Sequence, residues 1–315
     1  MLSRVAERMY WTGRYMERAE NMARLISANT RMALDSPREV PAPWQSMVQI
    51  LGLDRYYNEH YGAADERHVV RFLMADAGNP SSIVSSLAQA RENARTTREI
   101  LPNEAWEQIN DAYWHAREHA TRALPRNHRE PFLTGIVRTC QLLNGLLAGA
   151  MSHDDAYQFV LLGQNLERAD MTTRVLDLGV VGMTELVRTT RAGKTPTAFA
   201  NLAWLSVLSC LSGYHMYHQH VQTGVKGQEV MQFLLHDSRF PRAVAHCLAA
   251  LQDGVTRLPR HEQPLQAVTA MTKQLLGIEV APLLKQRLRT CMDNLQQALD
   301  RIHTAIETNW FRTTA

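Results

Sequence analysis

The sequence predicts an all-α fold, an internally duplicated bundle of about twelve helices, and three observations support this. Apolar residues recur at three- and four-residue spacing through nearly every long segment, and no segment alternates convincingly as a strand does. The 315 residues include only 16 Gly and 12 Pro, which is few for a chain built of short strands and turns. Two stretches also recur in the same order along the chain, which is typical of a repeated helical unit.

The first half of the chain opens with an uninterrupted helical pattern over residues 4–33, which contains no Pro and one Gly. We expect this helix to end before Pro37, because the residue preceding a proline avoids the helical conformation. Asn79-Pro80 is typical of a helix start and predicts a helix to residue 100, and Pro102 starts another to residue 122. Residues 124–130 are predicted to form an exposed connector.

The second half has the same character. Ser152 precedes a helical pattern that runs to Asp177, and Asp154 and Asp155 lie in its first turn, where the helix dipole favours negative charge. Three further prolines mark helix starts, and residues 255–263 are predicted to form an exposed connector before the second of them. These prolines are Pro241, Pro264 and Pro282, and the last starts a predicted amphipathic helix over 281–310.

The repeat is the most informative feature of the sequence. A segment of the first helix recurs 150 residues later, and two later blocks recur at offsets of 160 and 161. The matched pairs are Gly13 with Gly163, Glu17-Arg18-Ala19 with Glu167-Arg168-Ala169, Glu20 with Asp170, Arg24 with Arg174, Trp44 with Trp204, Phe72-Leu73 with Phe233-Leu234, Asp76 with Asp237 and Pro80 with Pro241. We therefore expect two copies of one helical unit, over 1–140 and 141–315, related by a pseudo-twofold axis within one compact body.

A charged stripe follows from this repeat. At 100° per residue, Gly13, Glu17, Glu20 and Arg24 share one face of a helix, whereas Arg18 projects about 100° away. The second copy repeats the stripe, and its Arg168 is likewise predicted to project away. Two interpretations stay open: the stripes pair with each other across the axis, or they line a shared cleft that holds a charged ligand. The candidate residues for such a cleft are Arg14, Glu17, Arg18, Glu20, Arg24, Glu167, Arg168, Asp170 and Arg174.

Other patterns are weaker. Arg91, Glu92 and Arg95 share one predicted helix and form either a solvated ion-pair face or an anion clamp that joins the cleft. We expect no metal at the His215-x-x-His218-x-His220 cluster, because the Glu-x-x-His pattern that a di-iron bundle needs is absent from the sequence. We expect no cofactor either, because neither a Walker nor a Rossmann glycine loop is present.

Composition and charge narrow the class of protein. A hydrophobic fraction of 45% with 21% charged residues is typical of a globular protein, and a net charge of +3 does not favour nucleic acid. Charged residues near the amino terminus stand where a signal peptide would have its apolar segment, so we expect no signal peptide. The most apolar window, 199–213, is too short to span a membrane. The four cysteines lack metal or redox spacing, and we expect free thiols in a cytoplasmic protein.

Residues 1–21 resemble the opening signature of the bacterial alpha-E family, and the segment from Leu162 to Asp170 resembles its second Glu-Arg motif. The segments 90–95, 104–107, 233–235 and 240–242 also resemble blocks of that family, while Gln164 and His215 depart from its pattern. The resemblance implies an accessory or binding subunit that acts with a circularly permuted ATP-grasp ligase and a transglutaminase-like peptidase in peptide synthesis or tagging. It leaves two alternatives: an enzyme acting on a peptide or aminoacyl substrate through its Glu-Arg residues, and a purely structural scaffold. It assigns no catalytic residue.

Overall fold

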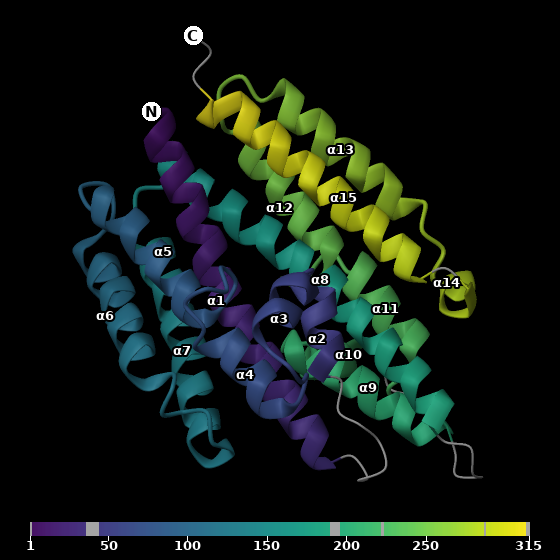
Figure 1. The fold of residues 1–315 in the computed structure, drawn as a ribbon. Helices are drawn as coiled ribbons and strands as arrows, with labels where there is room; N and C mark the ends of the chain where they lie inside the picture. Colours follow the sequence, from purple (N-terminus) through teal and green to yellow (C-terminus); the bar gives the residue numbers. More distant parts are fainter. Residues whose placement is uncertain (1, 36–43, 190–195, 222–223, 287, 313–315) are drawn as a thin grey trace.

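The protein is all-helical over the residues that its computed structural model describes, which are 2–35, 44–189, 196–221, 224–286 and 288–312. These residues form fifteen α-helices and one terminal π-helical turn (Figure 1). The first seven are α1 (Ser3–Asp35), α2 (Trp44–Ile50), α3 (Asp54–His60), α4 (Glu66–Met74), α5 (Ile83–Thr96), α6 (Asn103–His119) and α7 (Arg126–Ala150). The others are α8 (Asp155–Thr189), α9 (Pro196–Cys210), α10 (Tyr214–His220), α11 (Gly227–His236), α12 (Val244–Thr256), α13 (Glu262–Leu276), α14 (Val280–Gln286), α15 (Leu288–Ile306) and η1 (Glu307–Phe311).

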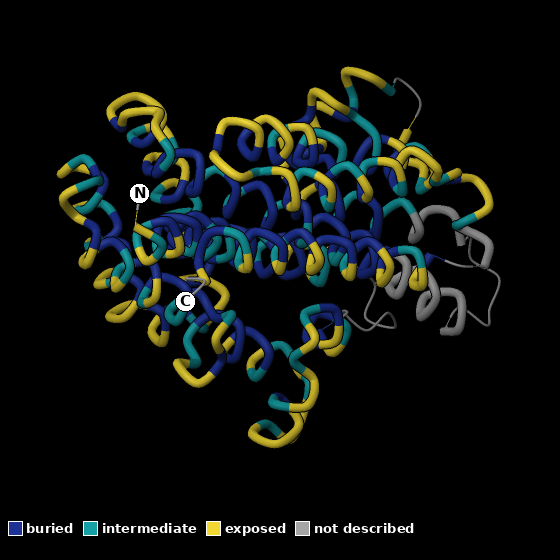
Figure 2. The backbone as a smooth tube through the Cα atoms, turned by 90° about the horizontal axis from the view of Figure 1, so that it is seen from above, coloured by how far each residue is buried: buried dark blue, intermediate teal, exposed yellow. Residues whose placement is uncertain are grey.

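The two longest helices, α1 and α8, lie at the centre of the bundle and pack directly against each other. Helices α5 and α7 cover one flank of α1, and α12 and α15 cover α8. Helix α1 also contacts α9, while α8 contacts α2. Figure 2 shows the consequence, since buried positions concentrate along the central helices and exposed ones on the outer turns.

The predicted first helix agrees with α1, because its apolar residues form a broad buried face without a helix breaker. The helix predicted from Asn79-Pro80 begins a few residues later than expected. The Asn79 side chain accepts a bond from the Ser81 N–H and donates to the Phe72 carbonyl, so it stabilises a turn. Ser82 is the actual N-cap of α5 and accepts a bond from the Ser85 N–H.

The expected connector over 124–130 is wrong in its larger part, because α7 begins at Arg126. Its polar sequence hides a buried residue, Arg129, whose guanidinium is paired with Glu66. Pro131, which directly follows the predicted connector, lies in the second turn of α7. The connector over 255–263 is shorter than expected, because α12 continues to Thr256 and α13 begins at Glu262.

The helix count exceeds the prediction, mainly because four helices, α2, α3, α10 and α14, have only seven residues each and are too short to show a clear period in the sequence. The helix expected over 281–310 corresponds to parts of α14, α15 and η1, with residue 287 outside the described residues. In the described part of the chain, no helix has both the length and the apolar character needed to cross a membrane.

Candidate functional site

Helices α1 and α8 touch backbone to backbone at two glycines. A Cβ atom on Gly13 would lie 2.2 Å from the carbonyl oxygen of Val160, and one on Gly163 would lie 2.0 Å from that of Tyr10. No side chain fits at such distances, so glycine at both positions permits the close approach. The contacts are reciprocal, because Tyr10 and Val160 are themselves 150 residues apart.

This close crossing brings Glu167 of α8 against two arginines of α1. Its carboxylate accepts a bond of 2.5 Å from Nε of Arg14 and one of 2.6 Å from Nε of Arg18. A second bond from Arg18, of 3.0 Å, completes a bidentate pair. The Glu167 side chain is only 3% exposed, so both of its oxygens are used inside the protein.

Glu17 of α1 also has two arginine partners. Arg168 of α8 donates a bond of 2.8 Å to its carboxylate, and Arg242 donates another of 2.7 Å. Arg242 lies just before α12 and also donates to Asn21 and Glu20. Glu17 and Glu167 therefore each have two arginine partners; both partners of Glu167 belong to the opposite central helix, whereas Glu17 has one from that helix and one from the turn before α12.

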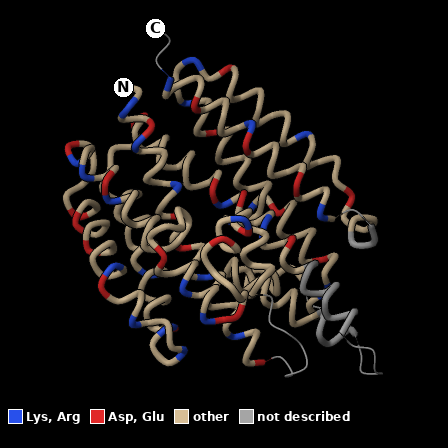
Figure 3. Tube along the Cα trace, viewed as in Figure 1, with Lys and Arg blue, Asp and Glu red and all other residues tan. Residues whose placement is uncertain are grey.

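Two further ion pairs flank this centre, each between residues four apart on one helix. Arg24 donates to Glu20, and Arg174 donates to Asp170. Figure 3 shows charged residues in the middle of the molecule as well as around its rim. We call the whole set the Glu-Arg network; its members are Arg14, Glu17, Arg18, Glu20, Arg24, Glu167, Arg168, Asp170, Arg174 and Arg242.

The electrostatic effect of the network is strong. Burial alone raises the pKa of the Glu17 carboxyl, but Arg168 and Arg242 outweigh it and lower that pKa to about 2. Burial acts on Glu167 in the same way, and Arg18 and Arg14 lower its pKa to about 2. Both carboxyls therefore stay ionised at neutral pH and are poor proton acceptors.

A pH dependence of stability follows from these values. A carboxyl whose pKa is lower in the folded than in the unfolded chain stabilises the fold above the unfolded value, here 4.5, and loses this contribution as the pH falls toward 2. We expect the melting temperature to be nearly constant from pH 7 to 5 and to fall steeply below pH 4.5. Thermal melts followed by circular dichroism between pH 7 and 2.5 measure this. The fall should be shallower in the Glu167→Gln variant, and an equally steep fall there would contradict the assignment.

The structure brings all nine predicted cleft residues into the network and places the two stripes against each other. Arg18 and Arg168 lie about 100° from the stripe on the helical wheel, but their long side chains reach sideways to the acid on the opposite helix. Sequence reasoning missed Arg242. The available signal was Gln164. It stands 150 residues after Arg14, where a strict repeat would have an arginine, so Glu17 would lack the second arginine that Glu167 has.

Arg91, Glu92 and Arg95 lie elsewhere, on α5. Arg91 donates to Asn110 and lies over the rings of Tyr113, Trp114 and Trp106 of α6. Arg95 pairs with Glu92 at an exposed position. Among the contacts of the described residues, no ion pair or hydrogen bond joins these three side chains to the Glu-Arg network.

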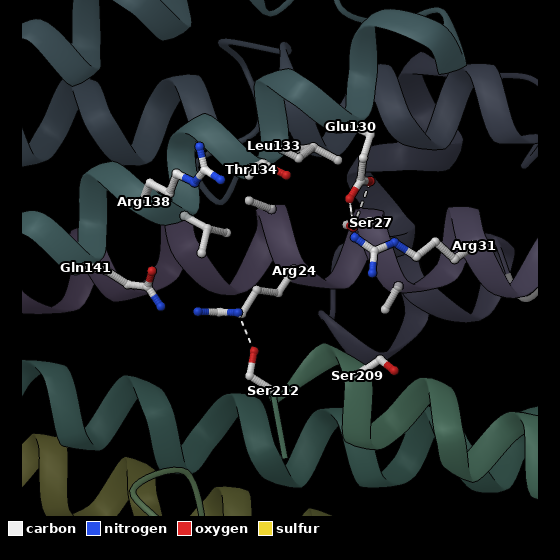
Figure 4. A pocket seen from close by; sticks show the side chains of 13 residues that line it. Arg24, Ser27, Arg31, Glu130, Leu133, Thr134, Arg138, Gln141, Ser209 and Ser212 are labelled. Atoms are coloured by element: carbon white, nitrogen blue, oxygen red, sulfur yellow. Dashed lines mark hydrogen bonds and ion pairs between the residues drawn. The ribbon is translucent and has the colours of Figure 1, made fainter. Parts of the chain in front are cut away.

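Arg24 extends from the network into a pocket of about 310 Å³ between α1, α7 and the end of α9 (Figure 4). Its guanidinium donates to the hydroxyl of Ser212. Arg138 projects from α7, is exposed, and within the described part of the chain has no ion-pair or hydrogen-bond partner. We call this the α1–α7–α9 pocket; its polar lining is Arg24, Ser27, Arg31, Glu130, Thr134, Arg138, Gln141, Ser209 and Ser212.

The pocket carries a net positive charge and a strained residue. Three arginines line it against one carboxylate, Glu130, which Arg31 and Ser27 engage. Arg24 is paired with Glu20 of its own helix, so Arg138 is the lining arginine that has no acid partner among the described residues. Ser212 has a φ of 53°, a left-handed conformation that costs a residue other than glycine about 1–2 kcal/mol. Its hydroxyl accepts a bond from Arg24 and retains one hydrogen to donate. The arrangement suits a small anion.

The cysteines and histidines offer no competing centre. All four cysteines are free, as expected, and burial raises the pKa of Cys210 and of Cys247 to about 12. These two thiols are therefore protonated and unreactive at neutral pH. Among the described residues, no three His, Cys, Asp or Glu side chains are grouped so that they could hold a metal ion.

Comparison with known proteins identifies the motif. A family described as a predicted alpha-helical domain with a conserved ER motif matches residues 1–311. Uncharacterised proteins of Mycobacterium bovis and Mycobacterium tuberculosis are 24% identical over 279 residues, which is 81% of this chain. The chain spans about a third of the length of these curated relatives, since the match covers 30% of each. No solved structure matches.

Proposed function

The chain belongs to the Alpha-E family, and from that premise we propose that it is a binding subunit of a peptide-ligase system. Its buried Glu-Arg network fixes the two central helices, and the α1–α7–α9 pocket receives the carboxylate end of a peptide. A guanidinium binds a carboxylate with paired, charge-assisted bonds, and Arg138 and Arg24 both line the pocket. A volume of about 310 Å³ accommodates a terminal residue or two.

Internal duplication is part of this proposal. The contacts of α1 and α8 support two copies over 1–140 and 141–315 about a pseudo-twofold axis, because the two glycine contacts and one Arg–Glu pair of each helix have counterparts at an offset of 150. The pseudo-twofold axis relates Gly13 to Gly163, and it relates the Arg18–Glu167 pair to the Arg168–Glu17 pair. The contacts of α1 with α9 and of α8 with α2 are also reciprocal in the order of the helices.

The observation that carries the binding proposal is a difference between these copies. Gly52, which lies 160 residues before Ser212, also has a left-handed backbone, with a φ of 68°. Glycine tolerates this conformation without cost, whereas serine does not. The second copy accepts that cost and gains a hydroxyl next to Arg24, which is the pattern of a strained functional residue.

A catalytic role for Glu17 and Glu167 has less support. A general base must reach the proton it removes and must have a pKa near the working pH. These carboxylates are nearly inaccessible, each is bound by two arginines, and each has a pKa of about 2. The geometry favours a structural task for them and a binding task for the pocket.

The partner in this proposal is a circularly permuted ATP-grasp ligase, which would activate the carboxylate that the pocket holds, with a transglutaminase-like peptidase in the same system. The resemblance of the Glu-Arg motifs supports this choice. The mycobacterial relatives are also consistent with it, since most of their length lies outside the matched region and could hold a fused partner. Size-exclusion chromatography of the chain mixed with such a ligase tests the pairing, and two peaks at micromolar concentration would argue against it.

The Ser212→Gly variant tests the pocket without breaking the fold. Glycine relieves the strained backbone, so the free energy of unfolding should stay the same or rise by about 1 kcal/mol. Loss of the hydroxyl should weaken binding of N-acetyl-alanyl-alanine about tenfold or more, since a hydrogen bond to a charged group contributes about 1.5–3 kcal/mol. Calorimetric titration and chemical denaturation measure the two effects.

The Arg138→Gln substitution should weaken binding of the same peptide by about tenfold or more, because it removes a charged hydrogen-bond donor. Arg257→Gln, an exposed residue paired with Asp253 on α12, is a control of equal charge change and should leave affinity unchanged. The carboxy-terminal amide of the peptide should not bind. Equal binding of acid and amide, or tighter Arg138-dependent binding of inorganic phosphate, would overturn the assignment to a peptide carboxylate.

A further inference from the structure

A second cavity, of about 710 Å³, lies between the start of α4 and the start of α7. We call it the α4–α7 cavity; its charged lining is Glu66, Arg67, Arg71, Arg126 and Arg129. Four positive charges against one negative leave +3 in this cavity. That value equals the formal net charge of the whole chain, so the remainder is neutral on balance.

One carboxylate serves two of these arginines. Arg126 donates a bond of 2.7 Å to Glu66 through Nε, and Arg129 donates another of 2.7 Å to the same carboxylate. Arg129 is only 3% exposed and is held in place by further bonds to the Thr30 hydroxyl and the Leu124 carbonyl. Among the described residues, its own Nε has no hydrogen-bond partner. The cavity thus has a rigid, buried positive charge that a single acid only partly compensates.

The other two arginines have no partner at all within the described residues. Arg67 and Arg71 are exposed, lie four positions apart on α4, and their side chains make neither an ion pair nor a hydrogen bond there. Like charges at this spacing destabilise a helix by a few tenths of a kcal/mol. Elsewhere on the surface, exposed arginines such as Arg55, Arg95 and Arg257 are paired with an acid on the same helix. Arg67 and Arg71 therefore bring two charges to this cavity that no acid of the described residues compensates.

The shape and surroundings of the cavity favour an acidic polypeptide over nucleic acid. Leu124, Pro125 and Thr121 form its uncharged wall, which suits the carbon atoms of a peptide. Nucleic-acid surfaces extend their positive charge along a stripe, whereas the four arginines here line one concave site, and the formal charges of the rest of the chain cancel. Carboxylate side chains match arginines in charge and in bidentate geometry.

We propose that the α4–α7 cavity is a docking site for an acidic segment of a partner protein. The site is separate from the α1–α7–α9 pocket and close to it, because Arg129 lines one and the next residue, Glu130, lines the other. A partner held here would have its remaining chain beside the peptide pocket. This inference goes beyond the proposed function and does not depend on it.

The test uses a fluorescent peptide of six glutamates with an amidated carboxy terminus, so that it has no terminal carboxylate for the other pocket. Fluorescence anisotropy at 50 mM salt should show saturable binding to the full chain. The double variant Arg67→Gln/Arg71→Gln should weaken it by about tenfold or more, since two charge-assisted contacts are lost. Both side chains are exposed, and the melting temperature of this variant should be unchanged.

Two matched variants decide the interpretation. Arg55→Gln/Arg257→Gln removes the same charge from exposed positions on other helices and should leave the affinity unchanged. Ser212→Gly, which weakens the peptide-carboxylate pocket, should also leave it unchanged, so failure of one proposal is distinguishable from failure of the other. If both double variants lost the same affinity for the peptide, binding would depend only on the net charge of the protein, and the proposal would be overturned. Absence of saturable binding, or stronger Arg67- and Arg71-dependent binding of a DNA duplex, would overturn it as well.

Discussion

Replacing Glu167 by glutamine is expected to lower the free energy of unfolding by about 3–5 kcal/mol. The change keeps the shape of the side chain and removes its charge, which leaves Arg14 and Arg18 without the carboxylate that compensates them. Both arginines are mostly buried, with 11% and 17% of their side chains exposed, so water cannot replace the lost partner fully. Urea denaturation at pH 7, with equal m-values for both proteins, measures the loss.

Glu17→Gln should cost a similar amount, because Arg168 and Arg242 lose their shared partner. Glu92→Gln is the matched control, since that carboxylate also pairs with an arginine but lies at the surface, and its effect should stay within about 0.5 kcal/mol. No arginine bonds to both acids, so the losses in the double variant Glu17→Gln/Glu167→Gln should add to within about 0.5 kcal/mol.

A neutral or stabilised Glu167→Gln variant would contradict the structural role of the network. It would mean that the fold keeps Glu167 and its two arginines at its centre although its stability does not need them, which is typical of a site strained for function. The peptide titrations would then be repeated on that variant, since the network itself would become the candidate binding site.

The sequence predicted the features of this protein that depend on periodicity. The apolar positions of α1 repeat at helical spacing and are buried, and the bounds of that helix agree within two residues with the prediction. The charged stripe could also be predicted, because Gly13, Glu17, Glu20 and Arg24 share one helical face whatever packs against it.

Features that depend on tertiary contacts could not be predicted from the sequence. Arg242 joins the network from a turn before α12, 225 residues from Glu17, and no local pattern indicates that separation. The left-handed backbone of Ser212 could not be predicted either. Serine rarely adopts this conformation, whereas a glycine at that position would have suggested it. The polar run before Pro131 was misread for a related reason, because Arg129 is buried only through its pairing with Glu66 of a distant helix.

Replacing either crossing glycine by alanine is the second change from which we expect a large effect. A new Cβ on Gly163 would meet the Tyr10 carbonyl oxygen at 2.0 Å, and that oxygen belongs to the backbone of α1 and cannot rotate away. The two helices must therefore separate, which stretches the bonds from Arg14 and Arg18 to Glu167. Overpacking alone costs about 1–3 kcal/mol, and we expect at least about 3 kcal/mol in total with the ion pairs weakened.

The intrinsic preference of a helix acts in the opposite direction, since alanine is favoured over glycine by about 1 kcal/mol. Gly145→Ala in α7 isolates that contribution, because nothing lies within 4 Å of its added Cβ, and this variant should be stabilised. Gly13→Ala should behave as Gly163→Ala does, since its Cβ would meet the Val160 carbonyl oxygen at 2.2 Å. Denaturation of the three variants separates propensity from packing. If all three were stabilised alike, the close crossing of α1 and α8 would be wrong, and the argument that glycine positions the Glu-Arg network would fail with it.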